Sequence, residues 1–165
     1  MFRTDPNRNA GFTIAELVTV CAIVAILAAV ALPVARFGIR RQKELQLHEQ
    51  LRKITDAIDR YHDYMTSAPG PKHPKDMMAL GSEGYPKELK DLVKGLELTD
   101  ATKVRFLRER DLIDPMNGKS DEWITLSTAD EPDSSGTKSG GVNIYEVHSS
   151  STALALDGKT HYNEW

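Results

Sequence analysis

Apolar side chains form one uninterrupted run near the amino terminus and are dispersed along the rest of the chain. Residues 17–35 contain a single polar side chain, Thr19, whose hydroxyl can bond back to its own helix. At 1.5 Å per residue, a helix of this length covers roughly the 30 Å hydrocarbon core of a bilayer. The run therefore predicts a membrane-spanning helix.

Two other interpretations of this run are open. A secretory signal peptide would be cleaved at Ala29-Val30-Ala31, but Pro33 and the length of the run weaken that interpretation. A buried core helix would need a larger soluble domain to cover it. Glu16 stands at the start of the run, where a carboxylate in hydrocarbon costs about 2.5–3.5 kcal/mol. A plain anchor or signal peptide has no use for this residue, so Glu16 indicates a functional site with a cationic partner.

A second apolar pattern extends the helix beyond the run. It recurs at alternating steps of four and three, which is one face of a helix, and its members are Leu47, Leu51, Ile54, Ile58, Tyr61 and Met65. We therefore predict one helix from about Phe12 to about Met65, loosened at Pro33 and Gly38 and ended by Pro69-Gly70-Pro71. The apolar stripe of its outer half requires a partner from the rest of the chain.

The remaining chain predicts two short helices. One covers Pro86 to Val93, with the proline in its first turn. The other is capped by Thr99 or Asp100 and reaches about Arg110.

Two strands are expected after these helices, at Trp123 to Leu126 and at Val142 to Val147. The residues between them, 127–141, have the composition of a loop. Together the elements predict an α+β fold, in which a long amino-terminal helix, membrane-spanning in its first half, packs on a small antiparallel β-sheet domain.

Composition narrows the possible functions. The chain has 165 residues and a net charge of −3, which gives no reason to expect nucleic acid as a partner. Its single cysteine, Cys21, lies in the apolar run, so no intramolecular disulfide is possible. His48-Glu49 begins like a zinc-protease motif, but Arg52 stands where the second histidine belongs. The serine spacing in residues 81–84 is wrong for a nucleophile elbow, and we expect no enzyme.

The stretch Gly11-Phe12-Thr13-Ile14-Ala15-Glu16, between a short basic leader and the apolar run, resembles the class III signal peptide of type IV pilins and pseudopilins. The resemblance implies that a prepilin peptidase cuts between Gly11 and Phe12 and that the new amino terminus of Phe12 is N-methylated. Counted from Phe12, Glu16 is then the fifth residue, and Pro33 takes the position where the family carries a helix-loosening proline.

The same resemblance gives Glu16 a partner. Cleavage creates an ammonium group on Phe12, and when such helices bundle into a filament, Glu16 of one chain meets that ammonium of a neighbour. Pairing offsets much of the cost of burying each charge and fixes the axial register. The simpler alternative is that Glu16 reaches the membrane interface and pairs with nothing.

The basic residues around the run conflict with this orientation. Arg36, Arg40, Arg41 and Lys43 follow the run closely, and the positive-inside count alone would place that flank in the cytoplasm. The resemblance implies the reverse, with the leader in the cytoplasm and the domain outside.

The carboxyl-terminal half carries a looser resemblance, to the globular domain of the type II secretion major pseudopilin. Its marks are Asp114-Pro115 after a short helix, Gly118 in a turn, Trp123 at a strand, and a later Asp157-Gly158. Members of that group often hold calcium near the carboxyl terminus, and this chain offers Asp157 together with Asp130, Glu131 and Asp133. Calcium is the only cofactor considered, and no ligand is assigned.

Together the two resemblances imply a structural subunit of a type II secretion pseudopilus. It would be stored in the bacterial inner membrane as a single-pass protein and polymerised into a periplasmic or extracellular filament that helps to export folded proteins. The implied partners are further copies of the chain, the prepilin peptidase, other pseudopilins, inner-membrane assembly proteins and membrane lipid.

The implied division is a leader at 1–11, a membrane or filament-core half-helix at 12–35, an outer half-helix at 36–66 and a periplasmic α+β domain at 67–165, in which residues 66–85 receive no role. A type IV pilus subunit for adhesion, motility or DNA uptake, and an unrelated secreted or anchored protein, are the alternatives.

Overall fold

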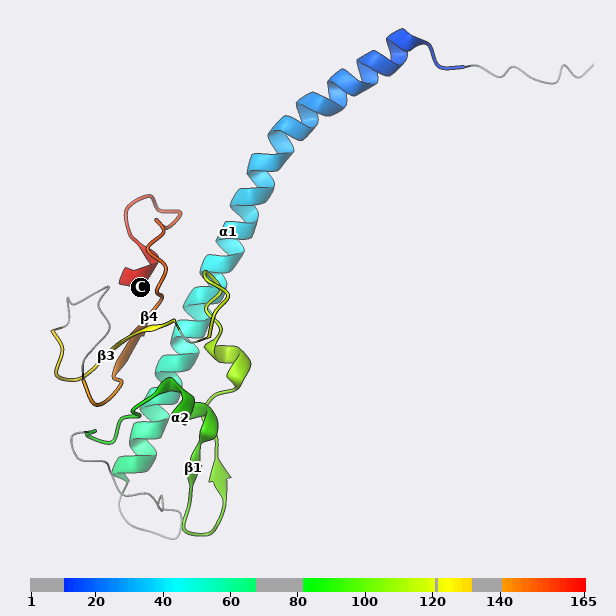
Figure 1. Cartoon of the computed structure of the whole chain (residues 1–165). Helices are drawn as coiled ribbons and strands as arrows, with labels where there is room; N and C mark the ends of the chain where they lie inside the picture. Colours follow the sequence, from blue (N-terminus) through cyan, green and yellow to red (C-terminus); the bar gives the residue numbers. More distant parts are fainter. Residues whose placement is uncertain (1–10, 68–81, 121, 132–140) are drawn as a thin grey trace, which may run out of the picture. The chain divides into compact units, whose positions relative to one another are not determined.

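The structure is a computed structural model that describes residues 11–67, 82–120, 122–131 and 141–165. The long helix α1 (Ile14–Thr66) comes first (Figure 1). It is followed by α2 (Leu89–Lys94), β1 (Leu96–Glu97), β2 (Lys103–Val104), the 3-10 helix η1 (Glu109–Leu112), β3 (Ile124–Leu126), β4 (Glu146–His148) and the 3-10 helix η2 (Tyr162–Glu164). Residues 1–10 of the leader, Pro69-Gly70-Pro71, most of 66–85, Asp133 and most of the 127–141 loop lie outside the described residues.

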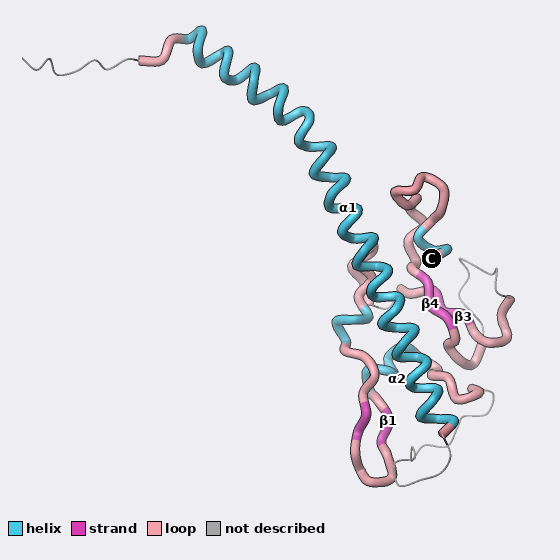
Figure 2. The backbone as a smooth tube through the Cα atoms, turned by 180° about the vertical axis from the view of Figure 1, so that it is seen from behind, coloured by secondary structure: helices cyan, strands magenta, loops and turns pink. Residues whose placement is uncertain are grey.

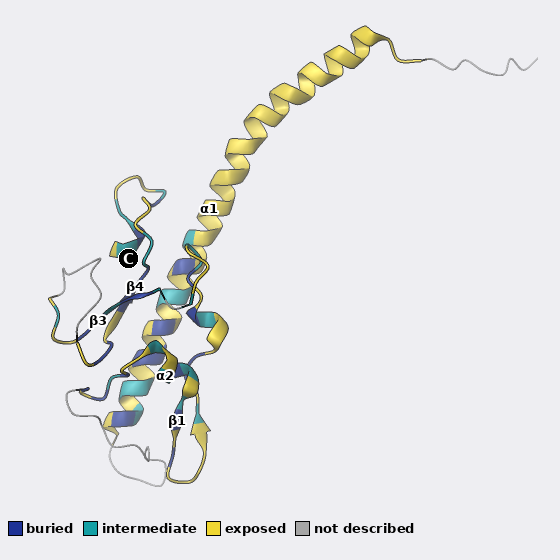
Figure 3. Cartoon of the chain, viewed as in Figure 1, coloured by how far each residue is buried: buried dark blue, intermediate teal, exposed yellow. Residues whose placement is uncertain are grey.

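The chain divides into two compact units between Ile39 and Arg40, within α1. In the first unit the described residues, 11–39, are all exposed (Figure 3). Among the described residues, α1 is the helix that is long and apolar enough to cross a membrane, and none of its apolar window is buried. A buried core helix is therefore the wrong interpretation of the run. The predicted helix is confirmed over nearly its full length, and α1 continues through Pro33.

In the second unit, the outer half of α1 supplies the core with its apolar stripe. Leu47, Ile54, Ala57, Ile58 and Met65 are buried, and Leu51 and Tyr61 pack against the same cluster. The partner that the stripe requires comes from later segments, through Leu92, Leu96, Phe106, Leu107, Leu112, Trp123, Ile144, Val147, Ala155 and Tyr162. At roughly 1.5–3 kcal/mol for each fully buried aliphatic or aromatic side chain, this cluster is the main favourable term in folding of the unit.

The first hairpin corrects one prediction. Residues 99–110 form no α-helix: β1 and β2 pair antiparallel, with Leu96 opposite Val104. The reason lies in the turn, where the Asp100 carboxylate accepts a hydrogen bond from the Thr102 N–H at 2.9 Å and Ala101 adopts a φ of 64°. An aspartate at this place caps a turn as readily as a helix. Gly95 is required just before β1, because its φ is 74° and an added Cβ would lie 2.1 Å from the Val104 carbonyl oxygen.

The second hairpin confirms both predicted strands, and each begins later than expected, β3 by one residue and β4 by four. β3 and β4 pair antiparallel, with Thr125 opposite Val147. The strand expected from residue 142 begins only at Glu146, because the backbone N–H of Ile144 donates to the Pro86 carbonyl instead. That contact also holds Pro86 ahead of α2, so the predicted helix at 86–93 begins later than expected, at Leu89. The α+β class is confirmed, and the described residues form two small antiparallel sheets (Figure 2).

Within the second unit, the two sheets lie on different sides of α1. In both views β3 and β4 lie on one side, whereas β1, β2 and η1 lie on the other (Figures 1 and 2). The helix is therefore the spine of this unit and separates its two lateral surfaces.

Candidate functional site

The first turn of α1 carries the residues predicted to be functional, and it is closed by a capping box. The Glu16 carboxylate accepts hydrogen bonds from the Thr13 N–H at 3.1 Å and the Thr13 hydroxyl at 3.2 Å, and the Glu16 N–H donates to that hydroxyl at 3.2 Å. Such reciprocal bonds satisfy N–H groups that a helix start leaves unpaired. Within one chain, Glu16 is thus hydrogen-bonded by a neutral residue of its own helix and has no cation as its partner among the described residues.

The residues just before this cap are open. Phe12 is 84% exposed, and a Cβ added at Gly11 would meet nothing within 4 Å. The described fold therefore gives no steric reason for a glycine at position 11. Cys21 is exposed as well, and the Thr19 hydroxyl donates to the Ala15 carbonyl at 2.8 Å, which confirms the back-bond expected from the sequence.

Comparison with known proteins bears on this segment. Residues 6–32 match the family model of the prokaryotic N-terminal methylation motif. The amino terminus of this chain therefore carries the N-terminal methylation motif, which supports its resemblance to type IV pilin-like proteins. Neither the comparison with curated proteins nor that with solved structures gave a match. The match covers Gly11, Phe12 and Glu16 and ends just before Pro33. It supports the predicted class III signal, whereas the individual roles of these four residues stay predictions.

A second polar site, in the carboxyl-terminal segment, was not found from the sequence. In the second unit, the part of α1 that begins at Arg40 contacts the segment 154–162. We call this group the carboxyl-terminal clasp, and its members are Arg40, Glu44, Leu154, Leu156 and Tyr162. The Glu44 carboxylate accepts hydrogen bonds from the Tyr162 hydroxyl at 2.8 Å and the Leu156 N–H at 2.7 Å. Arg40 donates from Nε to the Tyr162 hydroxyl oxygen at 3.1 Å and from Nη2 to the Leu154 carbonyl.

The clasp explains one of the cations that follow the apolar run. Arg40 donates hydrogen bonds within the folded unit, so it has a structural role there that is independent of any effect on membrane orientation. The Tyr162 ring is 2% exposed, and burial is the main cause that raises the pKa of its hydroxyl; the nearby Glu44 adds to the increase and Arg40 opposes it. The hydroxyl is therefore neutral at physiological pH and donates to Glu44.

One turn further along α1, the aromatic rings of His48 and Trp165 stack, with centroids 4.3 Å apart and planes 11° apart. The histidine that begins a broken zinc-protease motif in the sequence thus packs against the carboxyl-terminal aromatic ring. Arg40, Glu44 and His48 follow one another at steps of four, which places them on one stripe of the helix. That spacing is visible in the sequence, but it indicates only a shared helix face and gives no sign of the carboxyl-terminal segment that these residues contact.

The Asp114-Pro115 and Gly118 marks belong to one tight turn. The buried Asp114 carboxylate accepts hydrogen bonds from the Met116 N–H and the Ser149 hydroxyl, both at 2.7 Å. The Gly118 N–H donates to the Asp114 carbonyl at 2.7 Å, and Gly118 has a φ of 69°. Trp123 anchors the following strand, because its indole N–H donates to the Leu112 carbonyl at 2.5 Å. These residues come together as a structural unit.

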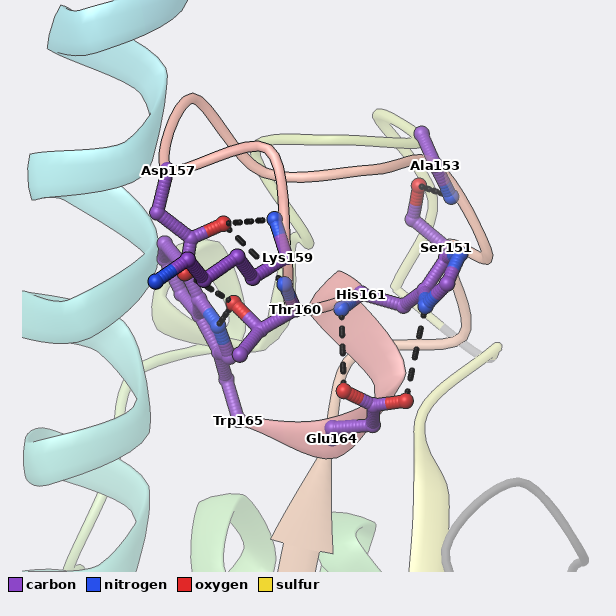
Figure 4. Close-up of polar contacts among 8 residues, drawn as sticks. All are labelled: Ser151, Ala153, Asp157, Lys159, Thr160, His161, Glu164 and Trp165. Carbon is purple, nitrogen blue, oxygen red and sulfur yellow. Dashed lines mark hydrogen bonds and ion pairs between the residues drawn. The ribbon is translucent and has the colours of Figure 1, made fainter.

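Asp157-Gly158 forms a second turn, and it bears on the calcium expectation (Figure 4). The Asp157 carboxylate accepts hydrogen bonds from the N–H groups of Lys159 and Thr160, at 2.8 and 3.0 Å, and from the Thr160 hydroxyl at 2.7 Å. The Lys159 N–H is the main cause that lowers the pKa of this carboxyl, followed by the two bonds from Thr160. Most acceptor positions of Asp157 are thus filled by its own turn.

Of the other acids offered for calcium, Asp133 lies outside the described residues. Asp130 accepts a hydrogen bond from the Ser127 N–H at 2.7 Å. Within the described parts of the chain, no group of three or more His, Cys, Asp or Glu side chains is placed to hold a metal ion. Calcium binding stays a prediction of the resemblance, and the turn at Asp157 is closed without it.

Proposed function

We propose that this pilin-like protein is a structural subunit of a type II secretion pseudopilus. It is stored in the inner membrane after leader cleavage and polymerised through its amino-terminal helix into a filament that helps to export folded proteins. The observation that carries the proposal is the methylation motif at residues 6–32, joined to an apolar half-helix that no part of the described chain covers. The role requires no cofactor and no catalytic centre.

Cohesion of the filament comes from the exposed apolar half of α1. Its side chains between Leu17 and Ile39 are mostly more than half exposed, including Leu17, Val18, Val20, Ile23, Val24, Ile26, Leu27, Val30, Leu32, Val34, Phe37 and Ile39. Lipid covers this surface in the stored subunit, and helices of neighbouring subunits cover it in the filament. Burial at about 25 cal/mol per Å² of apolar surface keeps such helices out of water in either state.

Register comes from Glu16 and the amino group that cleavage creates on Phe12. In one chain, the carboxylate is satisfied by Thr13, a neutral donor. In a bundle of helices, exchange of that donor for a neighbour's ammonium pairs two charges that would each be costly alone in a low-dielectric core. Only one axial stagger brings the two groups together, so the pair selects one alignment of neighbouring subunits.

Gly11 fits a role in leader cleavage, because the described fold places no steric constraint on the side chain at this position. Because a Cβ there would meet nothing within 4 Å, the described chain tolerates a larger residue at this position. A requirement for glycine would then come from the peptidase that cuts between Gly11 and Phe12. The choice of a secretion pseudopilus rests on the loose carboxyl-terminal resemblance, whose residues Asp114, Gly118 and Trp123 are built into one turn and strand start.

Mass spectrometry of the intact protein and of its amino-terminal peptide, purified from its own membrane, tests the proposal. We expect a chain that begins at Phe12 and carries one additional methyl group. A chain beginning at Leu32 would identify an ordinary secreted protein, and an uncut chain would leave Glu16 without an ammonium partner. Either result would overturn the proposal.

Deletion of the gene separates the pseudopilus from the type IV pilus. For a pseudopilus, folded exoproteins accumulate inside the cell envelope, while surface fibres, adhesion, motility and DNA uptake stay at the wild-type level. The opposite pattern would assign the chain to a pilus. Restoration by the wild-type gene, and failure of a Gly11→Leu variant to restore, would tie the phenotype to a processed subunit.

A further inference from the structure

A basic groove of about 400 Å³ lies on one lateral surface of the second unit, between α1 and the segment that joins β2 to η1. A volume of this order is typical of clefts that bind ligands. Its charged lining residues are four cations and one acid: Lys53 and Arg60 from α1, Arg105 and Arg108 from the β2–η1 segment, and Asp111 from η1. The groove therefore presents cations on both of its walls.

The guanidinium groups of this groove have no acidic partner. In the described part of the chain, no carboxylate pairs with Arg60, Arg105 or Arg108. Lys53 differs, because it pairs with Glu49 at 2.7 Å. A planar guanidinium binds an oxyanion through two parallel N–H donors. The groove therefore suits a ligand that carries carboxylates or phosphates.

The spacing of the cations requires more than one anionic group. Lys53 and Arg60 are seven positions apart on α1, which separates them by about 10 Å along the helix axis. Arg105 and Arg108 stand on the other wall. A ligand that contacts all four cations must therefore present several charges, spread along the groove and toward both walls.

Two features of the groove favour a peptide over a phosphate ligand. Asp111 lines the groove, and its carboxylate lies 3.9 Å from Arg110, which is outside the lining. A polyphosphate offers only acceptors and would place dense negative charge beside this carboxylate, whereas a peptide also offers backbone N–H donors. Phosphate sites are commonly built on converging backbone N–H groups. The N–H groups of Phe106 and Leu107 are not available for this, since both donate to the Leu92 carbonyl, at 3.1 and 3.2 Å.

We propose that this basic groove binds an extended acidic segment of another protein. In an extended strand, successive side chains point to opposite sides, and side chains two positions apart lie about 7 Å apart on the same side. Neighbouring acidic residues therefore reach the α1 wall and the β2–η1 wall in turn, and backbone N–H groups of the segment are available to Asp111. The inference goes beyond the proposed function, because it requires neither leader cleavage nor assembly.

Fluorescence anisotropy with a labelled peptide tests the proposal on the full-length chain in non-ionic detergent micelles. The probe is a peptide of alternating aspartate and glutamate flanked by glycines, and its uncharged counterpart carries asparagine and glutamine instead. We expect the acidic peptide to bind and the uncharged one not to bind at the same concentrations. Arg105→Gln with Arg108→Gln should weaken binding by at least about tenfold, because it removes two partners of charge-assisted hydrogen bonds.

A matched control and a folding measurement make the loss specific. Arg41→Gln with Lys159→Gln removes the same charge from two exposed cations outside the groove. It should change the affinity by less than about twofold, because salt screens exposed charges that lie away from the ligand. Arg105 and Arg108 are exposed as well, so thermal unfolding of both variants should match that of the wild type.

Competition by tripolyphosphate distinguishes a peptide ligand from a phosphate one. Tighter binding of tripolyphosphate than of the peptide, with the same dependence on Arg105 and Arg108, would overturn the proposal and assign the groove to a phosphate-bearing ligand. A wild-type chain that does not bind the acidic peptide, or an equal loss in the control variant, would overturn it too. None of these results bears on the proposed function, because the assay uses unassembled chains.

The reverse also holds. An uncut chain in the mass-spectrometric test would overturn the proposed function and leave the groove's affinity for the acidic peptide unaffected.

Discussion

The hydrogen bond between Tyr162 and Glu44 makes the carboxyl-terminal clasp directly testable. Tyr162→Phe keeps the buried ring and its edge-to-face contact with Trp165, whose centroid lies 5.1 Å away, and removes only the hydroxyl. The variant loses the bond donated to Glu44 and the one accepted from Arg40. Glu44 keeps the Leu156 N–H, and Arg40 keeps the Leu154 carbonyl.

The expected magnitude follows from these partners. A hydrogen bond to a charged group contributes about 1.5–3 kcal/mol when buried. Because Glu44 is only partly buried and Arg40 is exposed, water replaces part of what is lost. We therefore expect the free energy of unfolding to fall by about 1–2 kcal/mol. The second unit runs from Arg40 to Trp165, a length at which this change lowers Tm by about 4–8 °C.

A double-mutant cycle on the full-length chain in detergent micelles provides the assay. Unfolding is followed by tryptophan fluorescence, since Trp165 packs on Tyr162 and Trp123 is buried in the same core. Tyr162→Phe, Glu44→Gln and the double variant should show a coupling energy of about 1 kcal/mol. Tyr64→Phe serves as the control, because that ring packs on Phe106 and should change stability by less than about 0.5 kcal/mol. Additive effects, or an unchanged Tm in Tyr162→Phe, would show that the clasp does not hold the carboxyl-terminal segment.

Three further predictions follow from the sites described. Glu16→Leu removes a charge from the apolar helix, so membrane retention should be unchanged while filament yield falls by at least about tenfold; an unchanged yield, measured by shearing and sedimentation, would refute the register role. Asp114→Ala leaves the Ser149 hydroxyl and the Met116 N–H without their buried acceptor and should lower the free energy of unfolding by about 2–4 kcal/mol in chemical denaturation, and a change below about 1 kcal/mol would contradict the network. Folding raises the pKa of Tyr162, so its contribution to stability is complete below the unfolded-state pKa of about 10 and is lost as pH rises through the higher folded-state pKa. In an absorbance titration of phenolate, Tyr162→Phe should therefore show one late-titrating tyrosine fewer than the wild type.

Features encoded locally were predictable from the sequence. The class III signal is a contiguous string, and the family match falls on it. The stripe from Leu47 to Met65 has a fixed helical period, so its burial followed from spacing alone. Strands near Trp123 and Val147 were marked by aromatic and β-branched residues between turn signals.

What could not be predicted depends on distant partners or on backbone angles that leave no compositional mark. Asp100 suits a helix cap or a turn, and the positive φ of Ala101 selects the turn. Alanine gives no sign of this conformation in the sequence, because it rarely adopts a positive φ. The Tyr162–Glu44 bond joins residues 118 positions apart. In sequence, Arg40, Glu44 and His48 resemble an ordinary solvated helix face, and only the folded segment 154–165 shows what they hold.

The division of the core between α1 and later segments has a consequence for folding kinetics. The stripe from Leu47 to Met65 is synthesised early, yet the side chains that cover it, such as Trp123, Val147 and Tyr162, follow about sixty to a hundred residues later. Contacts of such large sequence separation form slowly, and until they form the stripe stays open to water. A nascent chain of this protein therefore exposes two apolar surfaces of one helix in succession, first the run at 17–35 and then the stripe from Leu47 to Met65. The stripe is fully covered only after the carboxyl-terminal residues have been synthesised. The interval between synthesis of residue 65 and closure of the clasp is when a chaperone or a protease has its best access to the chain.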